Sequence, residues 1–141
     1  MDLSIAPILT AGSSRVNVRL HHAVVLVCAA SAGVHAALVP DQLREGGPRL
    51  GGAFALSAVA TAVAAVLLHK PRSAKVTKTA LVATALTLLG VAVAYVLSRT
   101  SGLPFLITDP EALDPIGAVT SAAEVLGGLA CLSLLARKEV E

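Results

Sequence analysis

The chain has 141 residues, of which 55% are hydrophobic, 14% charged and only 2% aromatic, and its net charge is +2. A water-soluble domain is much less apolar, so this composition indicates a membrane protein. The net charge is small and the basic residues lie at the edges of apolar segments. This arrangement excludes the basic surface typical of nucleic-acid-binding proteins, and we expect no nucleic-acid partner.

Four apolar segments fill most of the chain. They are Leu20–Val39, Leu50–Leu68, Thr79–Ser98 and Ile116–Ala136. A helix needs about 20 residues to cross the hydrocarbon of a bilayer, and its backbone amides must be bonded within the segment. The sequence therefore predicts an all-α fold, an integral membrane four-helix bundle. We expect a single four-span domain over residues 20–136, with tails at 1–19 and 137–141.

The segment before the first span allows two interpretations. We expect residues 1–19 to form a mobile, weakly structured cytoplasmic tail. Arg15 and Arg19, followed by an apolar segment that contains Ala30-Ser31-Ala32, would also suit a cleavable signal peptide. The apolar segment continues to Val39, which favours a retained span over cleavage.

Residues that begin or end helices separate the predicted spans. Pro40 to Glu45, followed by Gly46-Gly47, predicts a short turn at the membrane surface, and Pro48 then begins the second span. Gly102-Leu103-Pro104 predicts the end of the third. Asp114-Pro115 supplies an N-cap and a first-turn proline for the fourth.

The basic residues are distributed unevenly between the two sides of the predicted bundle. Eight of them precede the first span, join the second to the third, or follow the fourth: Arg15, Arg19, Lys70, Arg72, Lys75, Lys78, Arg137 and Lys138. The other connectors hold three, Arg44, Arg49 and Arg99, together with five acidic residues. Loops rich in Lys and Arg stay in the cytoplasm. We therefore predict a multi-pass protein of the cell membrane with both termini in the cytoplasm.

Small residues within the spans could let helices approach closely. Gly33 and Ala37 form one small-xxx-small pair, and Gly127-Gly128 offers a second close-approach surface. In a chain this rich in alanine, such spacings also arise by chance. Both interpretations remain open for each pair.

Glu124 is an acidic residue inside a predicted span. It lies nine residues beyond Pro115, at a depth of about 13 Å, which is near the bilayer midplane. A carboxylate there costs on the order of 2.5–3.5 kcal/mol, so it should face the bundle and find a partner, or carry a proton. One interpretation is a proton- or cation-binding site. The other is a hydrogen-bonded contact between helices.

Counting residues along each span places other polar side chains near Glu124. Together they form a candidate intramembrane polar cluster of Glu124, His35, Arg99, Ser31, Ser57, Tyr95 and Thr120. Arg99 and Glu124 differ by about 13 Å in depth, so we expect them to be linked through His35, Tyr95 or a water. The alternative for His35 is an interfacial or hydrogen-bonded group near a helix end.

The sequence contains none of the motifs that would indicate an enzyme. It has no H-E-x-x-H, no Walker-type glycine loop, no Cys-x-x-Cys and no nucleophile elbow. Cys28 and His35 share a helical face but lie about 10 Å apart along it, too far to bind one metal ion. We expect no enzymatic activity, no catalytic residues, no metal site and no cofactor.

The segment Ser98-Arg99-Thr100-Ser101-Gly102-Leu103-Pro104, with the helix end His35 to Pro40 and with Glu124, carries a family resemblance. It resembles an uncharacterised family of small four-helix integral membrane proteins of high-GC Gram-positive bacteria. The resemblance implies the four-span architecture and draws attention to Arg99, His35 and Glu124, without adding a mechanism. The small multidrug transporters are similar in having four spans and one intramembrane Glu, but theirs lies in the first helix among aromatic residues.

These observations favour a non-enzymatic function. We expect an accessory, scaffolding or sensing module in the lipid bilayer, with a membrane-protein partner or a second copy of the chain. The alternative is a small proton- or cation-coupled transporter that uses Glu124. Such a transporter would need a dimer to enclose a pathway.

Overall fold

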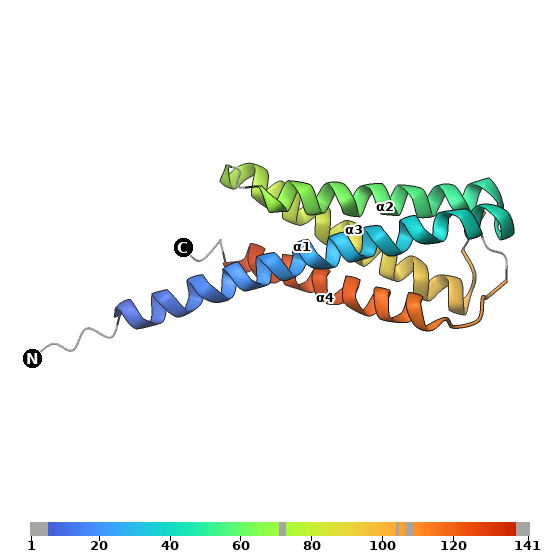
Figure 1. Ribbon diagram of the computed structural model, residues 1–141. Coiled ribbons are helices and arrows are strands. Elements are labelled where there is room, and N and C mark those ends of the chain that lie inside the picture. Colours follow the sequence, from blue (N-terminus) through green and yellow to red (C-terminus); the bar gives the residue numbers. More distant parts are fainter. Residues whose placement is uncertain (1–5, 71–72, 104, 107–108, 138–141) are drawn as a thin grey trace, which may run out of the picture.

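The computed structural model describes residues 6–70, 73–103, 105–106 and 109–137. They form a bundle of four helices: α1 (Ala6–Glu45), α2 (Gly47–His69), α3 (Ala74–Thr100) and α4 (Pro115–Arg137). The helices alternate in direction, so the start of α1 and the end of α4 lie at the same end of the bundle (Figure 1). We call this the terminal end. The opposite end, with the α1–α2 turn and the α3–α4 connection, is the distal end.

Each helix packs against two neighbours, in the cyclic order α1, α2, α3, α4. The α1–α2 contact is the most extensive, and α2 and α3 share the fewest contacts of these neighbours. The first part of α1 extends beyond the other three helices at the terminal end (Figure 1). The bundle is therefore most loosely closed between α2 and α3.

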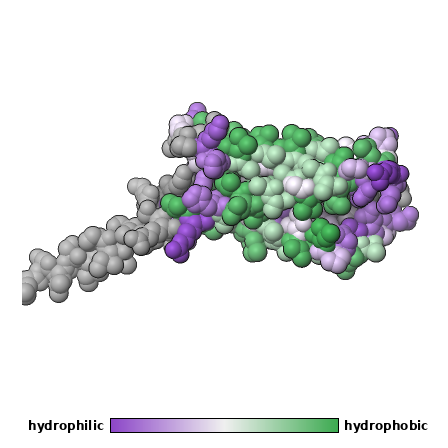
Figure 2. All heavy atoms as spheres, viewed as in Figure 1, coloured by the Kyte–Doolittle hydropathy of each residue, from purple (hydrophilic) through white to green (hydrophobic). Residues whose placement is uncertain are grey.

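All four helices are long and apolar enough to cross a membrane. Their outer faces carry large apolar side chains, such as Leu26, Leu56, Leu86 and Val119, each of which is about 70% exposed. These faces form an apolar belt, with hydrophilic residues gathered at both ends of the bundle (Figure 2). An apolar surface of this extent suits contact with lipid rather than with water. The prediction of an all-helical fold with four helices long and apolar enough to cross a membrane is confirmed.

The first helix is longer than predicted, with 40 residues. The predicted turn from Pro40 to Glu45 is wrong, because α1 continues through Pro40 to Glu45. A proline at this position removes only one backbone hydrogen bond, which a helix near its end can lose without breaking. The chain instead turns at Gly46 and Gly47, where Gly47 has a φ of +76° that favours glycine.

The segment 1–19, expected to have little regular structure, is helical from Ala6 onwards. Pro7 stands in the first turn of α1, where a proline costs no helical hydrogen bond. Residues 1–5 lie outside the described part, and the mobility of the tail stays a prediction.

The other predicted helix boundaries agree with the structure. Helix α3 ends at Thr100, just before Gly102, which has a φ of +74°. Pro48 lies in the first turn of α2. Asp114 caps α4, since its Oδ1 accepts a 2.6 Å hydrogen bond from the backbone N–H of Gly117. Local sequence signals thus set these three boundaries.

A closely packed apolar core fills the terminal half of the bundle. Its buried members are Val24, Cys28, Ala64, Leu68, Ala80, Leu81, Ala85, Leu88, Cys131 and Leu134. Gly128 lets α4 approach α3, because a Cβ there would lie 2.6 Å from Cγ of Leu89. Gly33, by contrast, would have nothing within 4 Å of an added Cβ. Close approach therefore explains the glycine pair of α4 and not Gly33 of α1.

Candidate functional site

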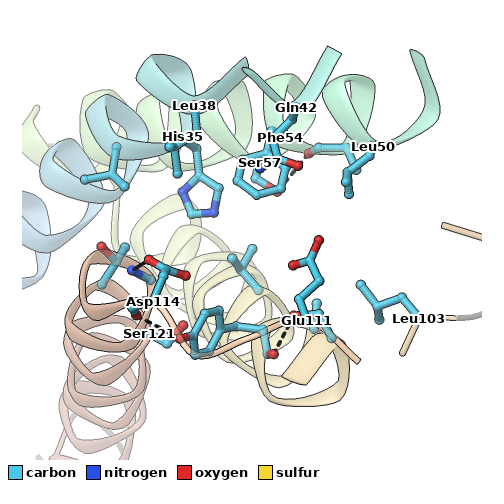
Figure 3. Close-up of a pocket in the computed structure, with 18 of the residues that line it drawn as sticks. His35, Leu38, Gln42, Leu50, Phe54, Ser57, Leu103, Glu111, Asp114 and Ser121 are labelled. Atoms are coloured by element: carbon cyan, nitrogen blue, oxygen red, sulfur yellow. Dashed lines mark hydrogen bonds between the residues drawn. The ribbon is translucent and has the colours of Figure 1, made fainter. Parts of the chain in front are cut away.

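A cavity of about 790 Å³ occupies the distal half of the bundle, beyond the apolar core. All four helices and the α3–α4 connection line it. His35 and Phe54 lie on one side of the open space, and Glu111 and Asp114 lie on the other (Figure 3). The bundle is thus packed at the terminal end and hollow at the distal end.

Ser31, His35 and Glu124 form an inner polar group where the cavity meets the core. The hydroxyl of Ser31 donates a 2.7 Å hydrogen bond to Oε1 of Glu124, and Nδ1 of His35 lies 3.8 Å from the same oxygen. All three residues are buried, and Glu124 is only 1% exposed. Its second oxygen, Oε2, has no hydrogen-bond partner among the described residues. One oxygen of this carboxyl group is therefore buried without a hydrogen-bond partner among these residues.

The backbone of α1 fixes the tautomer of His35. Its Nδ1 lies 2.9 Å from the carbonyl oxygen of Ser31, one turn earlier in the helix. A carbonyl oxygen can only accept, so Nδ1 carries the proton and Nε2 is free to accept a hydrogen bond when the ring is neutral. The ring also contacts Phe54 of α2, with 5.5 Å between the ring centroids. His35, which lines the cavity, is thus held from two sides.

Arg99 is the centre of an outer ion-pair network that also includes Glu111, Asp114 and Tyr95. Its guanidinium lies 2.7 Å from Oδ2 of Asp114 and 2.9 Å from Oε2 of Glu111. The same group lies 4.9 Å from the centroid of the Tyr95 ring, and the Tyr95 hydroxyl donates a 3.1 Å hydrogen bond to the carbonyl of Asp114. These contacts fasten the connection before α4 to the end of α3.

Neither His35 nor Tyr95 links Arg99 to Glu124 among the described residues, and a link through a water stays a prediction. Arg99 pairs with Asp114 and Glu111 instead. The physical reason is depth: Asp114 and Glu111 lie at the distal end beside Arg99, whereas Glu124 lies about 13 Å deeper along its helix. A short ion pair at the rim costs less strain than a long reach into the bundle.

The structure places six of the seven candidate residues on the cavity wall. They are His35, Ser57, Tyr95, Arg99, Thr120 and Glu124. The seventh, Ser31, is joined to the wall by its hydrogen bond to Glu124. Ser57 and Thr120 contribute to the wall outside both polar groups, and the Ser57 hydroxyl donates to the carbonyl of Ala53 in its own helix. The single predicted cluster is thus divided into the inner polar group and the outer ion-pair network.

Sequence reasoning missed three residues of the site. Asp114 was expected only as a helix cap, yet its Oδ1 caps α4 while its Oδ2 pairs with Arg99. Glu111 joins the same network. The signal was present, since both acids lie in the connector that follows the span of Arg99. For Phe54, nothing in the sequence indicated contact with His35.

The site combines a buried carboxyl group, an oriented imidazole and a large cavity, which together could bind a small molecule. Among the described residues, no three His, Cys, Asp or Glu side chains are placed to hold a metal ion. Comparisons with protein-family models, with curated proteins and with solved structures find no match to this chain.

Proposed function

We propose that this chain is a non-catalytic, multi-pass protein of the cell membrane that senses a small molecule bound in its distal cavity. The observation that carries this proposal is the cavity of about 790 Å³ above a closely packed core. Pockets for small molecules generally measure about 300–1,000 Å³ and combine apolar walls with a few polar groups. Membership of the uncharacterised high-GC Gram-positive family that the sequence resembles is part of the same proposal.

The charges at the two ends of the bundle support an orientation with the cavity facing outward. At the terminal end, the Lys, Arg, Asp and Glu side chains that the structure describes are all basic: Arg19, Lys70, Lys75, Lys78 and Arg137. At the distal end, acidic residues of α1 and of the α3–α4 connection accompany the arginines. Under the positive-inside rule, the terminal end lies in the cytoplasm and the cavity opens outside the cell.

The shape of the cavity favours sensing over passage. The core of the terminal half separates the cavity from the terminal end of the bundle. The cavity lies partly between α2 and α3, which share the fewest contacts among neighbouring helices. A ligand there would change the packing of these two helices. A membrane-protein partner or a second copy of the chain could then read that change.

The second candidate function is proton- or cation-coupled transport by a dimer. The observation that favours it is Glu124, a buried carboxyl group in the cavity wall, one oxygen of which has no hydrogen-bond partner in the described part of the chain. The two functions differ in a flux measurement on proteoliposomes. Transport predicts proton or cation movement that Glu124→Gln abolishes, whereas sensing predicts none.

Cysteine accessibility tests the proposed function directly. Ser57→Cys and Thr61→Cys lie one turn apart on α2, but Ser57 lines the cavity, whereas Thr61 is 0% exposed in the packed half. A membrane-impermeant thiol reagent added to intact cells should modify Ser57→Cys and spare Thr61→Cys. The native Cys28 and Cys131 are both 0% exposed and should also be spared. An unreactive Ser57→Cys would show that no outward-facing cavity exists.

A further inference from the structure

We propose that the distal cavity binds a small organic cation with an apolar body, such as an alkyl or aryl ammonium compound. This inference rests on the proposed function, since it names the class of ligand for the same cavity. Three independent features of the wall support it: its net charge, the unpartnered oxygen of Glu124, and its apolar and aromatic surfaces.

The wall of the cavity carries an excess of negative charge. Five carboxyl side chains line it, from Asp41, Glu45, Glu111, Asp114 and Glu124, against the single guanidinium of Arg99. That guanidinium is already paired with Asp114 and Glu111. Arg44, which does not line the cavity, lies 3.1 Å from Asp41. The residues that line the cavity thus carry five carboxyl groups and one guanidinium, and a cation entering from the distal end would be attracted.

Glu124 gives the cavity a specific position for positive charge. It is 1% exposed and lines the inner end of the cavity, and Oε2 has no partner among the residues that the structure describes. A buried carboxylate without a full set of partners is costly, and a cationic ligand would offset that cost. An anionic ligand would be repelled, and a neutral apolar ligand would leave the oxygen unpaired.

The rest of the wall suits an organic body. Val34, Leu38, Leu50, Val91, Ala94 and Leu103 supply an apolar lining. Phe54 and Tyr95 add two aromatic rings. Aromatic faces attract ammonium groups, and the Tyr95 ring already contacts one cation, the guanidinium of Arg99. The described residues contain no group of three side chains suited to a metal ion. The chemistry of the wall therefore favours an organic cation over an inorganic one.

The test compares two thiol reagents of opposite charge on Ser57→Cys protein in membranes. One reagent is trimethylammonium-ethyl methanethiosulfonate, and the other is sulfonatoethyl methanethiosulfonate. The ratio of their reaction rates reports the electrostatic potential of the cavity, and Thr100→Cys, at an exposed site on the distal end of α3, supplies the reference ratio. We expect the cation-to-anion ratio to be at least about tenfold larger at Ser57→Cys than at Thr100→Cys.

Adding Glu124→Gln to the Ser57→Cys protein should lower the cation-to-anion rate ratio. The amide cannot carry the negative charge of a carboxylate, but it still offers an acceptor to Ser31. Glu45→Gln at the exposed rim should lower that ratio by less, and provides a second variant outside the buried part of the bundle. Circular dichroism checks that each variant is folded.

Protection by unreactive ligands completes the test. Benzyltrimethylammonium should slow the modification of Ser57→Cys, whereas its neutral isostere neopentylbenzene and the anion benzylsulfonate should protect at least about tenfold less well at equal concentration. Equal protection by all three, or a rate ratio equal to that of Thr100→Cys, would overturn the ligand class and leave the cavity in place. If neither thiol reagent reacts with Ser57→Cys, the proposed function itself fails.

Discussion

Ser31 on α1 and Glu124 on α4 are 93 positions apart in the chain and are joined by a 2.7 Å hydrogen bond inside the bundle. Both side chains are buried, so neither can exchange its partner for bulk water. The bond therefore fixes how α1 and α4 face one another. It leaves Oε2 of Glu124, which is also buried, without a hydrogen-bond partner among the described residues.

Two replacements of Glu124 separate the contribution of its hydrogen bond to Ser31 from that of its charge. Glu124→Gln keeps an oxygen that can accept from Ser31, so we expect little change in stability. Glu124→Leu leaves the Ser31 hydroxyl without its interhelical partner, which should cost about 1–3 kcal/mol of unfolding free energy. Thermal melts followed by circular dichroism in mild detergent would measure the difference.

A double-mutant cycle provides the control for this prediction. Ser31→Ala removes the donor, so Glu124→Leu should cost less in the Ser31→Ala background than in the wild type. Equal costs in the two backgrounds, or a Leu variant as stable as the Gln variant, would contradict an energetic role for the pair.

Two glycines offer a matched test of helix packing. A Cβ at Gly128 would lie 2.6 Å from Leu89, whereas a Cβ at Gly90 would have nothing within 4 Å. Gly128→Ala should therefore destabilise the bundle, by about 1–3 kcal/mol for an overpacked contact. Gly90→Ala should be neutral or slightly stabilising, because alanine favours helix over glycine by about 1 kcal/mol. Melting temperatures that fall equally for both would rule out close packing as the reason for Gly128.

Most of the helical architecture could be predicted from the sequence, because apolar length and local capping residues determine it. Asp114 with Pro115 gave the start of α4, and Gly102 marked the end of α3. The path of α1 through Pro40 could not be predicted in this way. Proline weakens a helix by a local cost that neighbouring contacts can outweigh, and the extensive packing of α1 on α2 is not visible in the sequence.

The sequence predicted which residues belong to the candidate site, but not which of them contact one another. Depth along each span placed Ser31 at the level of Glu124 and His35 one turn nearer the outside, and the structure brings the three side chains together. Depth alone does not give the rotation of a helix, which decides which side chains meet. Arg99 shows the consequence, since its partners Glu111 and Asp114 come from a connector whose path no periodicity describes.

The outer ion-pair network should hold the α3–α4 connection in place. Arg99→Gln removes the charged partner of Asp114 and Glu111, and we expect the backbone amides of residues 111–114 to exchange hydrogen faster, by about tenfold or more for a loss of 1.5–3 kcal/mol. Hydrogen exchange with mass spectrometry would measure this. Arg44→Gln is the matched control, because the Arg44–Asp41 pair is largely exposed and should contribute about 0–1 kcal/mol. Unchanged exchange in Arg99→Gln would show that the connection is held by other contacts.

The orientation of the bundle can be tested with reporter fusions after Ala74 and after Leu106, at opposite ends of α3. Ala74 is followed by Lys75 and Lys78, and we expect a reporter there to be active in the cytoplasm. A reporter after Leu106 should be active only outside the cell, and reporters on the same side would contradict a four-span topology.

The charge bias behind this expected orientation can be varied independently. Replacing Lys70, Lys75 and Lys78 by Gln changes the distribution of Lys and Arg from eight against three to five against three. This weaker bias should give a mixed population of orientations, whereas a fully retained orientation would mean that features other than these lysines determine it.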